Sequence, residues 1–158
     1  MRRWDLINAF INACGYESYL EIGLSKGKNF NRIDCSLKDS VDPAEGKYAG
    51  SNPKYKMISD DFFEKVAPGL GYNYDLVFID GLHISEQVDK DIHNSIRYLN
   101  ANGSIVLHDC NPIDENRQKV PRIQAAWNGD VWKSVVRLRS SDSPSPYFRT
   151  WASTPVSV

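Results

Sequence analysis

The pattern of apolar and polar positions is clearest in the middle of the chain, where two short apolar runs flank a helical repeat. Leu76–Ile79 and Ile105–Leu107 are too short for helices, are rich in β-branched residues and end in polar clusters, which is typical of buried strands. Between them, Ser85–Leu99 carries apolar residues three or four positions apart and charges on the other face, which predicts an amphipathic helix. Strand, helix and strand in this order predict a right-handed βαβ unit with parallel strands.

Weaker patterns on both sides of this unit predict the other elements. Further strands are expected at Tyr19–Ile22, Lys38–Val41 and Tyr55–Ile58, with a last one near Tyr147–Ser153. Further helices are expected at Arg3–Ala13, Lys28–Ile33, Pro121–Trp127 and Val131–Leu138, and from Phe62 onward. We therefore predict a single α/β domain over residues 1–158, with a doubly wound, Rossmann-like parallel sheet in the order 3-2-1-4-5 and helices on both faces.

Composition and charge narrow the classes of function. With 158 residues, 41% of them hydrophobic and 25% charged, the chain suits one soluble globular domain. The net charge of -1 gives no general attraction to nucleic acid or to an anionic membrane. No apolar run approaches the roughly 20 residues of a membrane span and the start lacks a signal-peptide pattern, so we expect a cytoplasmic protein. Three cysteines without a C-x-x-C pair disfavour a disulfide framework or a zinc site.

Polar residues follow both strands of the central unit. Because neighbouring parallel strands end at the same edge about 4.8 Å apart, Asp80 and Asp109 should lie side by side, flanked by His83 and His108. Two carboxylates so placed repel each other unless they share a proton or a cation. An imidazole with an ordinary pKa of about 6.5 suits proton abstraction at neutral pH, which makes His83 a candidate base. The alternative is that the acids cap helices or bond to loops.

A glycine turn follows the first predicted strand. Gly23 and Gly27 would let the backbone approach a ligand closely where the sheet sends its first strand into the first helix. Asp42 lies 19 residues past Gly23, at the end of the next strand, where a carboxylate can accept bonds from ribose hydroxyls. Together they suggest an adenosine-containing ligand. Ser25 replaces the second glycine of the dinucleotide fingerprint, so a ligand without phosphates is favoured over NAD.

The same turn also matches G-x-S-x-G, the nucleophile elbow of α/β hydrolases, with Ser25 as the nucleophile. Asp80 and either His83 or His108 would complete a triad in the required chain order. The elbow belongs on a central strand with several strands before it, whereas here one short helix precedes the turn. The hydrolase and the NAD-binding enzyme stay as less favoured alternatives.

The segments YLEIGLSKG, VDP, ISDDFF, DLVFIDGLH and IVLHDCNP together resemble class I S-adenosylmethionine-dependent methyltransferases. The resemblance is greatest to the branch of small-molecule and sugar O-methyltransferases with a D-G-x-H signature. It covers about Tyr19 to Pro112, together with the segment Gly129–Lys133 that this branch often carries. The D-G-x-H segment followed by HDCNP is the specific part of the match.

The resemblance implies a binding site for S-adenosylmethionine. In this family the glycine turn and the acid before it, here Glu21, cradle the methionine part of the cofactor. Asp42 would hold the ribose, and Ser59 with Asp60 would border the adenine. The complete implied set of cofactor-binding residues is Glu21, Gly23, Ser25, Gly27, Asp42, Ser59, Asp60 and Asp80.

The resemblance also implies a divalent metal and an acceptor. Relatives often bind a metal through acids that match Asp80 and Asp109, while His108 stands where they often have another acid. The implied function is metal-assisted O-methylation of a small-molecule or sugar hydroxyl, with magnesium or manganese on Asp80, His108 and Asp109 and with His83 as the catalytic base. Neither a nucleic acid nor a membrane is expected as a partner.

The chain departs from the family by a shortened C-terminal strand region. Members usually finish the sheet with an antiparallel pair of strands, and Tyr147–Val158 suffices for only one of them. Another copy of the chain could supply the missing edge strand, which would make a homo-oligomer. The alternative function is therefore a degenerate methyltransferase fold that binds or assembles without catalysis.

Overall fold

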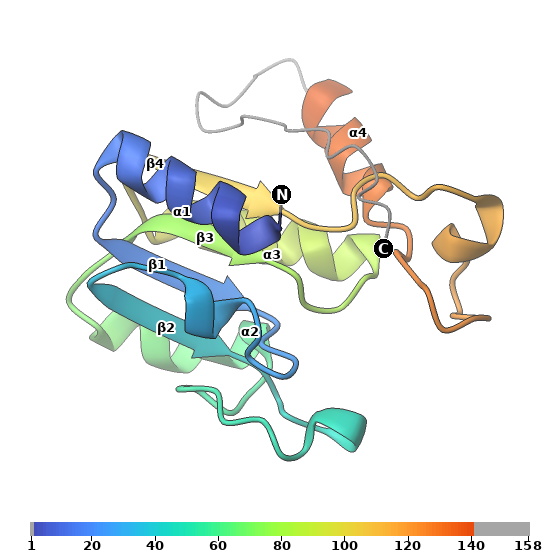
Figure 1. Ribbon diagram of the computed structural model, residues 1–158, viewed down its shortest axis with the longest axis horizontal. Coiled ribbons are helices and arrows are strands. Elements are labelled where there is room, and N and C mark those ends of the chain that lie inside the picture. Colours follow the sequence, from blue (N-terminus) through green and yellow to red (C-terminus); the bar gives the residue numbers. More distant parts are fainter. Residues whose placement is uncertain (1, 141–158) are drawn as a thin grey trace.

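Four parallel strands form the central sheet of the computed structural model, which describes residues 2–140 (Figure 1). They are β1 (Ser18–Ile22), β2 (Leu37–Val41), β3 (Tyr74–Ile79) and β4 (Leu99–Leu107). Their order in the sheet is β2-β1-β3-β4, and each neighbouring pair is parallel. All four carboxyl ends therefore reach the same edge of the sheet, as the arrowheads in Figure 1 show.

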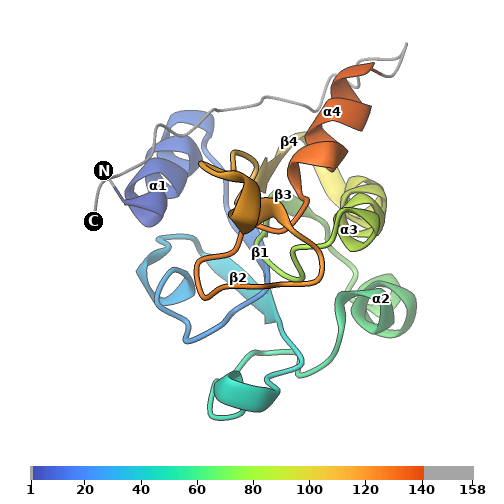
Figure 2. The ribbon, with the colours of Figure 1, turned by 90° about the vertical axis from the view of Figure 1, so that its right-hand side faces the viewer.

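Helices cover both faces of this sheet, with α1 on one face and α2 and α3 on the other (Figure 2). Their bounds are α1 Arg3–Cys14, α2 Ser59–Asp61, α3 Ser85–Arg97 and α4 Trp132–Ser140. Short 3-10 turns occur at Phe30–Arg32, Gly46–Tyr48, Ala67–Gly69 and Glu115–Gln118, and a π turn at Phe62–Val66. The predicted doubly wound α/β architecture is confirmed. Within residues 2–140, no helix is long and apolar enough to cross a membrane.

The predicted strand order survives in shortened form. The third predicted strand, Tyr55–Ile58, is reduced to one parallel bridge between Tyr55 and Val41, beside β2 where the order places it. Pairing stops there because the amide of Met57 bonds back to the carbonyl of Tyr55, which turns the chain away from the sheet. The strand predicted near Tyr147–Ser153 lies outside the described residues.

Two predicted helices are wrong or shortened. Pro121–Trp127 is an irregular loop, in which the side chain of Arg122 bonds to the carbonyls of Gln124 and Ala125. The helix predicted at Lys28–Ile33 is only the 3-10 turn Phe30–Arg32. At Pro121–Trp127 the starting proline was insufficient to specify a helix, because isolated short helices need an apolar face that packs.

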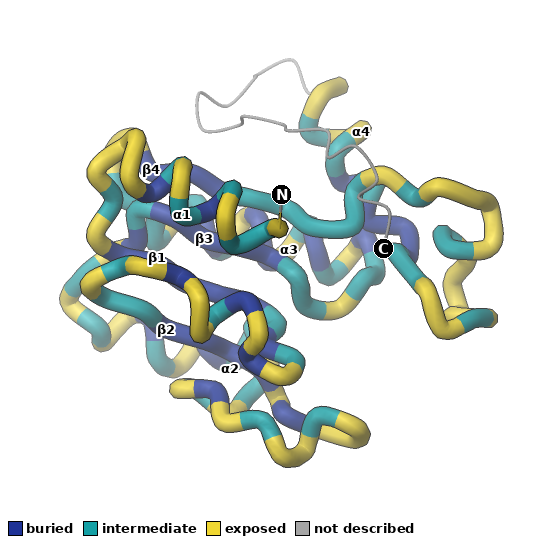
Figure 3. Tube along the Cα trace, in the orientation of Figure 1, coloured by how far each residue is buried: buried dark blue, intermediate teal, exposed yellow. Residues whose placement is uncertain are grey.

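The core has one layer on each face of the sheet, because alternate strand residues point to opposite sides. Figure 3 shows that buried residues concentrate along the strands. One layer joins Leu20 and Val77 to Phe62 beneath α2 and α3. The other joins Leu76 to Ile7 of α1. The strands are thus buried on both faces, which explains why their sequences read as continuous apolar runs.

We predict that Leu76→Ala lowers the free energy of unfolding by about 2–5 kcal/mol, because it leaves a cavity in the middle of the sheet. Leu76 is fully buried, at 0% exposure. Leu82→Ala is the matched control, since Leu82 is 53% exposed and should change stability by less than about 0.5 kcal/mol. Urea unfolding followed by circular dichroism measures both, and equal losses would contradict the two-layered core.

Candidate functional site

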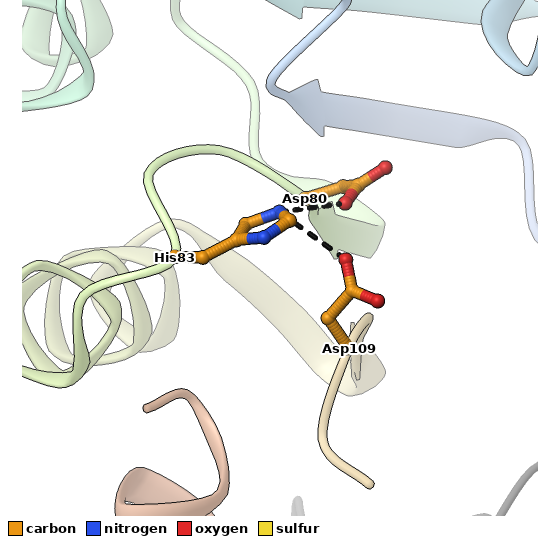
Figure 4. Close-up of side chains that lie close together, drawn as sticks. All are labelled: Asp80, His83 and Asp109. Carbon is orange, nitrogen blue, oxygen red and sulfur yellow. Dashed lines mark ion pairs between the residues drawn. The ribbon is translucent and has the colours of Figure 1, made fainter. Parts of the chain in front are cut away.

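The loops after β3 and β4 bring two acids and two histidines together at the carboxyl edge of the sheet. Figure 4 shows three of them, Asp80, His83 and Asp109. Nε2 of His83 lies 3.4 Å from Oδ1 of Asp80 and 3.3 Å from Oδ2 of Asp109. Nδ1 of His108 lies 3.2 Å and 3.0 Å from the same two oxygen atoms. The expected placement of Asp80 beside Asp109 is confirmed, and both imidazoles face the gap between them.

Backbone geometry at the end of β4 turns the second acid toward the first. The amide of His108 donates to the carbonyl of Ile79, which extends the pairing of β3 and β4 to the start of the site. Asp109 then adopts a left-handed conformation, with φ of 57°. Aspartate tolerates this region better than most residues, so the turn is compatible with an acid at this position.

The charges of the cluster stabilise one another. Burial disfavours ionised Asp80, yet the neighbouring imidazoles of His108 and His83 hold its pKa well below the usual range. Burial also disfavours the two imidazolium ions, but the carboxylates outweigh it, raising the pKa of His83 and bringing the pKa of His108 to about 10. The two acids therefore favour a positive charge on the imidazoles beside them.

Arg3 of α1 is a site residue that the sequence did not reveal. Its Nη1 donates to Oδ2 of Asp80 at 2.7 Å, on the carboxylate oxygen that the imidazoles leave free. The two residues are 77 positions apart, and the apolar stripe of α1 predicts only that the helix packs on the sheet. No local signal in the sequence could have identified this contact.

The glycine turn is tight and packs directly on the start of the acidic site. Gly23, Ser25 and Gly27 all have positive φ, at 91°, 53° and 69°. A Cβ added to Gly23 would lie 2.1 Å from the backbone oxygen of Asp80, so only glycine lets the turn approach β3 this closely. The turn and the acid cluster are thus parts of one surface.

Asp42 holds this turn in place. Its Oδ2 accepts the amides of Leu24 and Ser25 at 2.8 Å and 3.0 Å, and its Oδ1 accepts the amide of Ala44 at 2.6 Å. A carboxylate offers about four acceptor positions, so one position is left for another donor. Binding of a ribose by Asp42 stays a prediction. The structure adds that Asp42 fixes the conformation of the turn.

Glu21 is buried beneath the turn without a cation in hydrogen-bond contact. Its Oε2 accepts the hydroxyl of Tyr19 at 2.6 Å and the amide of Asn29 at 2.9 Å. Burial raises its pKa to about 7, although both of these bonds lower it. With this raised pKa, the carboxyl group can ionise near neutral pH when a positive charge binds beside it. Its predicted position near the methionine part of the cofactor is consistent with this property.

Ser59 and Asp60 stand at the start of α2 and bond to α3. The hydroxyl of Ser59 donates to Oδ1 of Asp91 at 2.6 Å, and the side-chain amide of Gln87 donates to Oδ1 of Asp60 at 2.8 Å. These bonds fix the two helices to each other. The predicted contact of both residues with an adenine stays a prediction, and Asp91 is a buried acid of this region that sequence reasoning missed.

A sequence model of a family described as a methyltransferase domain matches residues 20–110, which include the turn, Asp80, His83 and Asp109. The chain belongs to this methyltransferase family. The resemblance inferred from the sequence is thus confirmed, and the hydrolase interpretation of the glycine turn loses its basis. No curated protein sequence matches the chain.

Solved structures with the same fold are O-methyltransferases. The O-methyltransferase from Bacillus cereus in complex with SAH is 11% identical, with a TM-score of 0.65 over 89% of this methyltransferase and 70% of that chain. TomG from Streptomyces achromogenes, in complex with SAM, is 12% identical, with a TM-score of 0.62 over 89% and 69%. A protein from Klebsiella pneumoniae is 12% identical, with a TM-score of 0.61 over 89% of this chain and 69% of that chain. At such identities the likeness establishes the fold.

Glu21 makes the stability of this methyltransferase depend on pH in a predictable direction. Its folded pKa of about 7 lies above the ordinary value of 4.5, so the folded state holds the proton more tightly. Stability should therefore fall as pH rises through this interval, by up to about 3 kcal/mol from this residue. Glu21→Gln should remove this decrease of the unfolding free energy with pH, measured by urea unfolding between pH 5 and 8. Glu17→Gln is the control, because Glu17 is exposed and its replacement should leave the pH dependence unchanged. Parallel slopes for wild type and Glu21→Gln would contradict this.

Proposed function

We propose that this protein is an S-adenosylmethionine-dependent O-methyltransferase that uses a divalent metal and acts on a small-molecule or sugar hydroxyl. The observation that carries the proposal is the convergence of Asp80, His83, His108 and Asp109 on one gap, directly beside the glycine turn. A cofactor on the turn and an acceptor at the gap would therefore be neighbours. Family membership and the named activities of the similar structures support the same reaction.

The residues around the turn fit the cofactor. S-adenosylmethionine carries a positive sulfonium and an ammonium group, and Glu21 offers a buried carboxyl group whose pKa of about 7 lets it ionise in response. The remaining acceptor position of Asp42 suits a ribose hydroxyl. Its bonds to the turn would then couple the shape of the turn to occupation of the ribose site.

The residues at the gap fit a divalent cation. Asp80 and Asp109 each offer a carboxylate oxygen, and Nδ1 of His108 lies 3.2 Å and 3.0 Å from these oxygens. A nitrogen of His83 also lies within 4.8 Å of both acids, which would suit a third ligand, but we assign His83 to the proton of the acceptor. Carboxylate oxygens suit magnesium and manganese, and imidazole nitrogen shifts the preference toward transition metals. A divalent cation, when bound, lowers the pKa of a coordinated hydroxyl, as it does for bound water.

His83 is the proposed base. Its Nδ1–H donates to the carbonyl of Trp127 at 3.1 Å, which fixes the tautomer and leaves Nε2 to accept the proton of the acceptor hydroxyl. A positive charge at the gap lowers the pKa of His83, which keeps Nε2 unprotonated before reaction. The acceptor oxygen then forms its bond to the methyl carbon as the carbon–sulfur bond breaks, and S-adenosylhomocysteine leaves. The chain's main task is to align the two reactants.

We predict that S-adenosylhomocysteine raises the midpoint of thermal unfolding and that NAD does not. A ligand present at about 100 times its Kd stabilises the folded state by about 2.7 kcal/mol. Differential scanning fluorimetry with each compound measures this. Stabilisation by NAD alone would contradict the cofactor assignment, and Asp42→Ala should reduce the shift because it releases the turn.

His83→Ala should lower kcat by roughly 10²–10⁴-fold, the usual loss for a general base, while leaving the affinity for S-adenosylhomocysteine within about twofold. His93→Ala is the matched control, because His93 is an exposed histidine on α3 and should not alter kcat. Methyl transfer from labelled S-adenosylmethionine to a panel of hydroxyl compounds provides the readout, and calorimetry gives the affinity.

Two outcomes would favour other functions. Turnover that survives both chelation of metals and His83→Ala would mean that the acids are structural and that transfer proceeds by proximity alone. Cofactor binding without methylation of any acceptor would favour the non-catalytic binding or assembly module.

A further inference from the structure

The segment Trp127–Asp130, between β4 and α4, contacts both sides of the acid and histidine cluster. Trp127 accepts the Nδ1–H of His83 on its carbonyl at 3.1 Å, and its indole stacks on the imidazole with ring centroids 5.4 Å apart. The next residue, Asn128, donates its side-chain amide to Oδ1 of Asp109 at 2.6 Å. Two adjacent residues thus orient one histidine and one acid of the site.

This segment is clamped to the start of α3. Oδ1 of Asp130 accepts the amide of Ser85 at 2.7 Å, and Oδ2 accepts its hydroxyl at 3.2 Å. Gly129 has φ of 62°, and a Cβ on it would lie 1.7 Å from the carbonyl oxygen of His83. The backbone of the segment therefore lies directly against the backbone of the D-G-x-H loop, with no room for a side chain between them.

A second set of bonds holds the segment from the other side. The amides of Asn128 and Gly129 donate to the carbonyl of Arg117 at 2.9 Å and 3.0 Å. The indole Nε1 of Trp127 donates to the carbonyl of Lys119 at 2.7 Å. Figure 2 shows the whole connection crossing in front of the carboxyl ends of the strands. The segment is therefore fixed on both sides of the cluster.

We infer that Trp127 and Asn128 are positioning residues of the metal and base site, a role that rests on the proposed function. Asn128 occupies Oδ1 of Asp109 with a neutral donor, so Oδ2 is the oxygen left to face the gap. Trp127 holds the imidazole plane of His83 by stacking and by the bond to Nδ1, so that Nε2 points at the same gap. Neither residue adds a charge, so both orient ligands without competing with a cation.

The test measures the affinity of the full-length protein for Mn²⁺ by calorimetry, without cofactor or acceptor. Asn128→Ala should weaken Mn²⁺ binding by roughly 10–100-fold, as loss of a group that orients a ligand usually does, while the Kd for S-adenosylhomocysteine stays within about twofold. Asn100→Ala is the matched control. Asn100 donates the same kind of bond, at 2.7 Å, to Oδ1 of Asp75, which precedes Leu76 at the opposite end of β3.

Unchanged Mn²⁺ affinity in Asn128→Ala, or an equal loss in Asn100→Ala, would overturn the inference. Asn128→Leu, which keeps the shape of the side chain without its donor, replaces the alanine variant if that variant does not fold. Should the wild-type protein not bind Mn²⁺ at all, the metal part of the proposed function fails. The orientation of His83 then decides the inference by itself.

That orientation is visible in the imidazole proton resonances of His83, because protons over an indole face are shielded. Trp127→Leu should move these resonances downfield, and Asn128→Ala should move them through the displaced carboxylate of Asp109. Asn100→Ala should leave them in place. Resonances of His83 that are the same in all three variants and in the wild-type protein would overturn the inference whether or not a metal binds.

Discussion

Repulsion between Asp80 and Asp109 is the constraint on which the site depends. Two like charges about 4 Å apart at a protein surface repel by about 4 kcal/mol at an effective dielectric constant of about 20, so the pair needs positive charge nearby. The structure supplies it from three directions, with imidazoles on the facing oxygens and Arg3 on the outer oxygen of Asp80. The two acids are thus surrounded by side chains that can carry positive charge.

The parallel sheet is what makes this concentration of charge possible. Because every strand ends at the same edge, residues that follow different strands become neighbours without any long loop reaching across the fold. The close approach of Gly23 to the backbone of Asp80 then joins the turn after β1 to the acids after β3. A ligand on the turn would contact the acid cluster because of the topology alone.

The topology is also what the sequence could predict. Apolar runs with a helical repeat between them identify the βαβ unit, and the parallel pairing of its two strands puts Asp80 beside Asp109. The contacts of Arg3 and Asn128 could not be predicted in this way, because loop conformation and helix docking determine them over 77 and 19 residues. The helix predicted at Pro121–Trp127 fails because its apolar side chains have no surface to pack on, as the 58% exposure of Ile123 shows.

The balance of charge also gives the proposed reaction a direction. Methyl transfer turns a cationic sulfonium into a neutral thioether, while the acceptor hydroxyl gives up a proton that Nε2 of His83 can hold between Asp80 and Asp109. If the cofactor binds where the family resemblance places it, the buried carboxyl group of Glu21, with its pKa of about 7, would gain a positively charged partner and lose part of that charge after transfer. In the proposed reaction positive charge therefore moves from the cofactor side of the site to His83, where Asp80 and Asp109 lie 3.4 Å and 3.3 Å from Nε2.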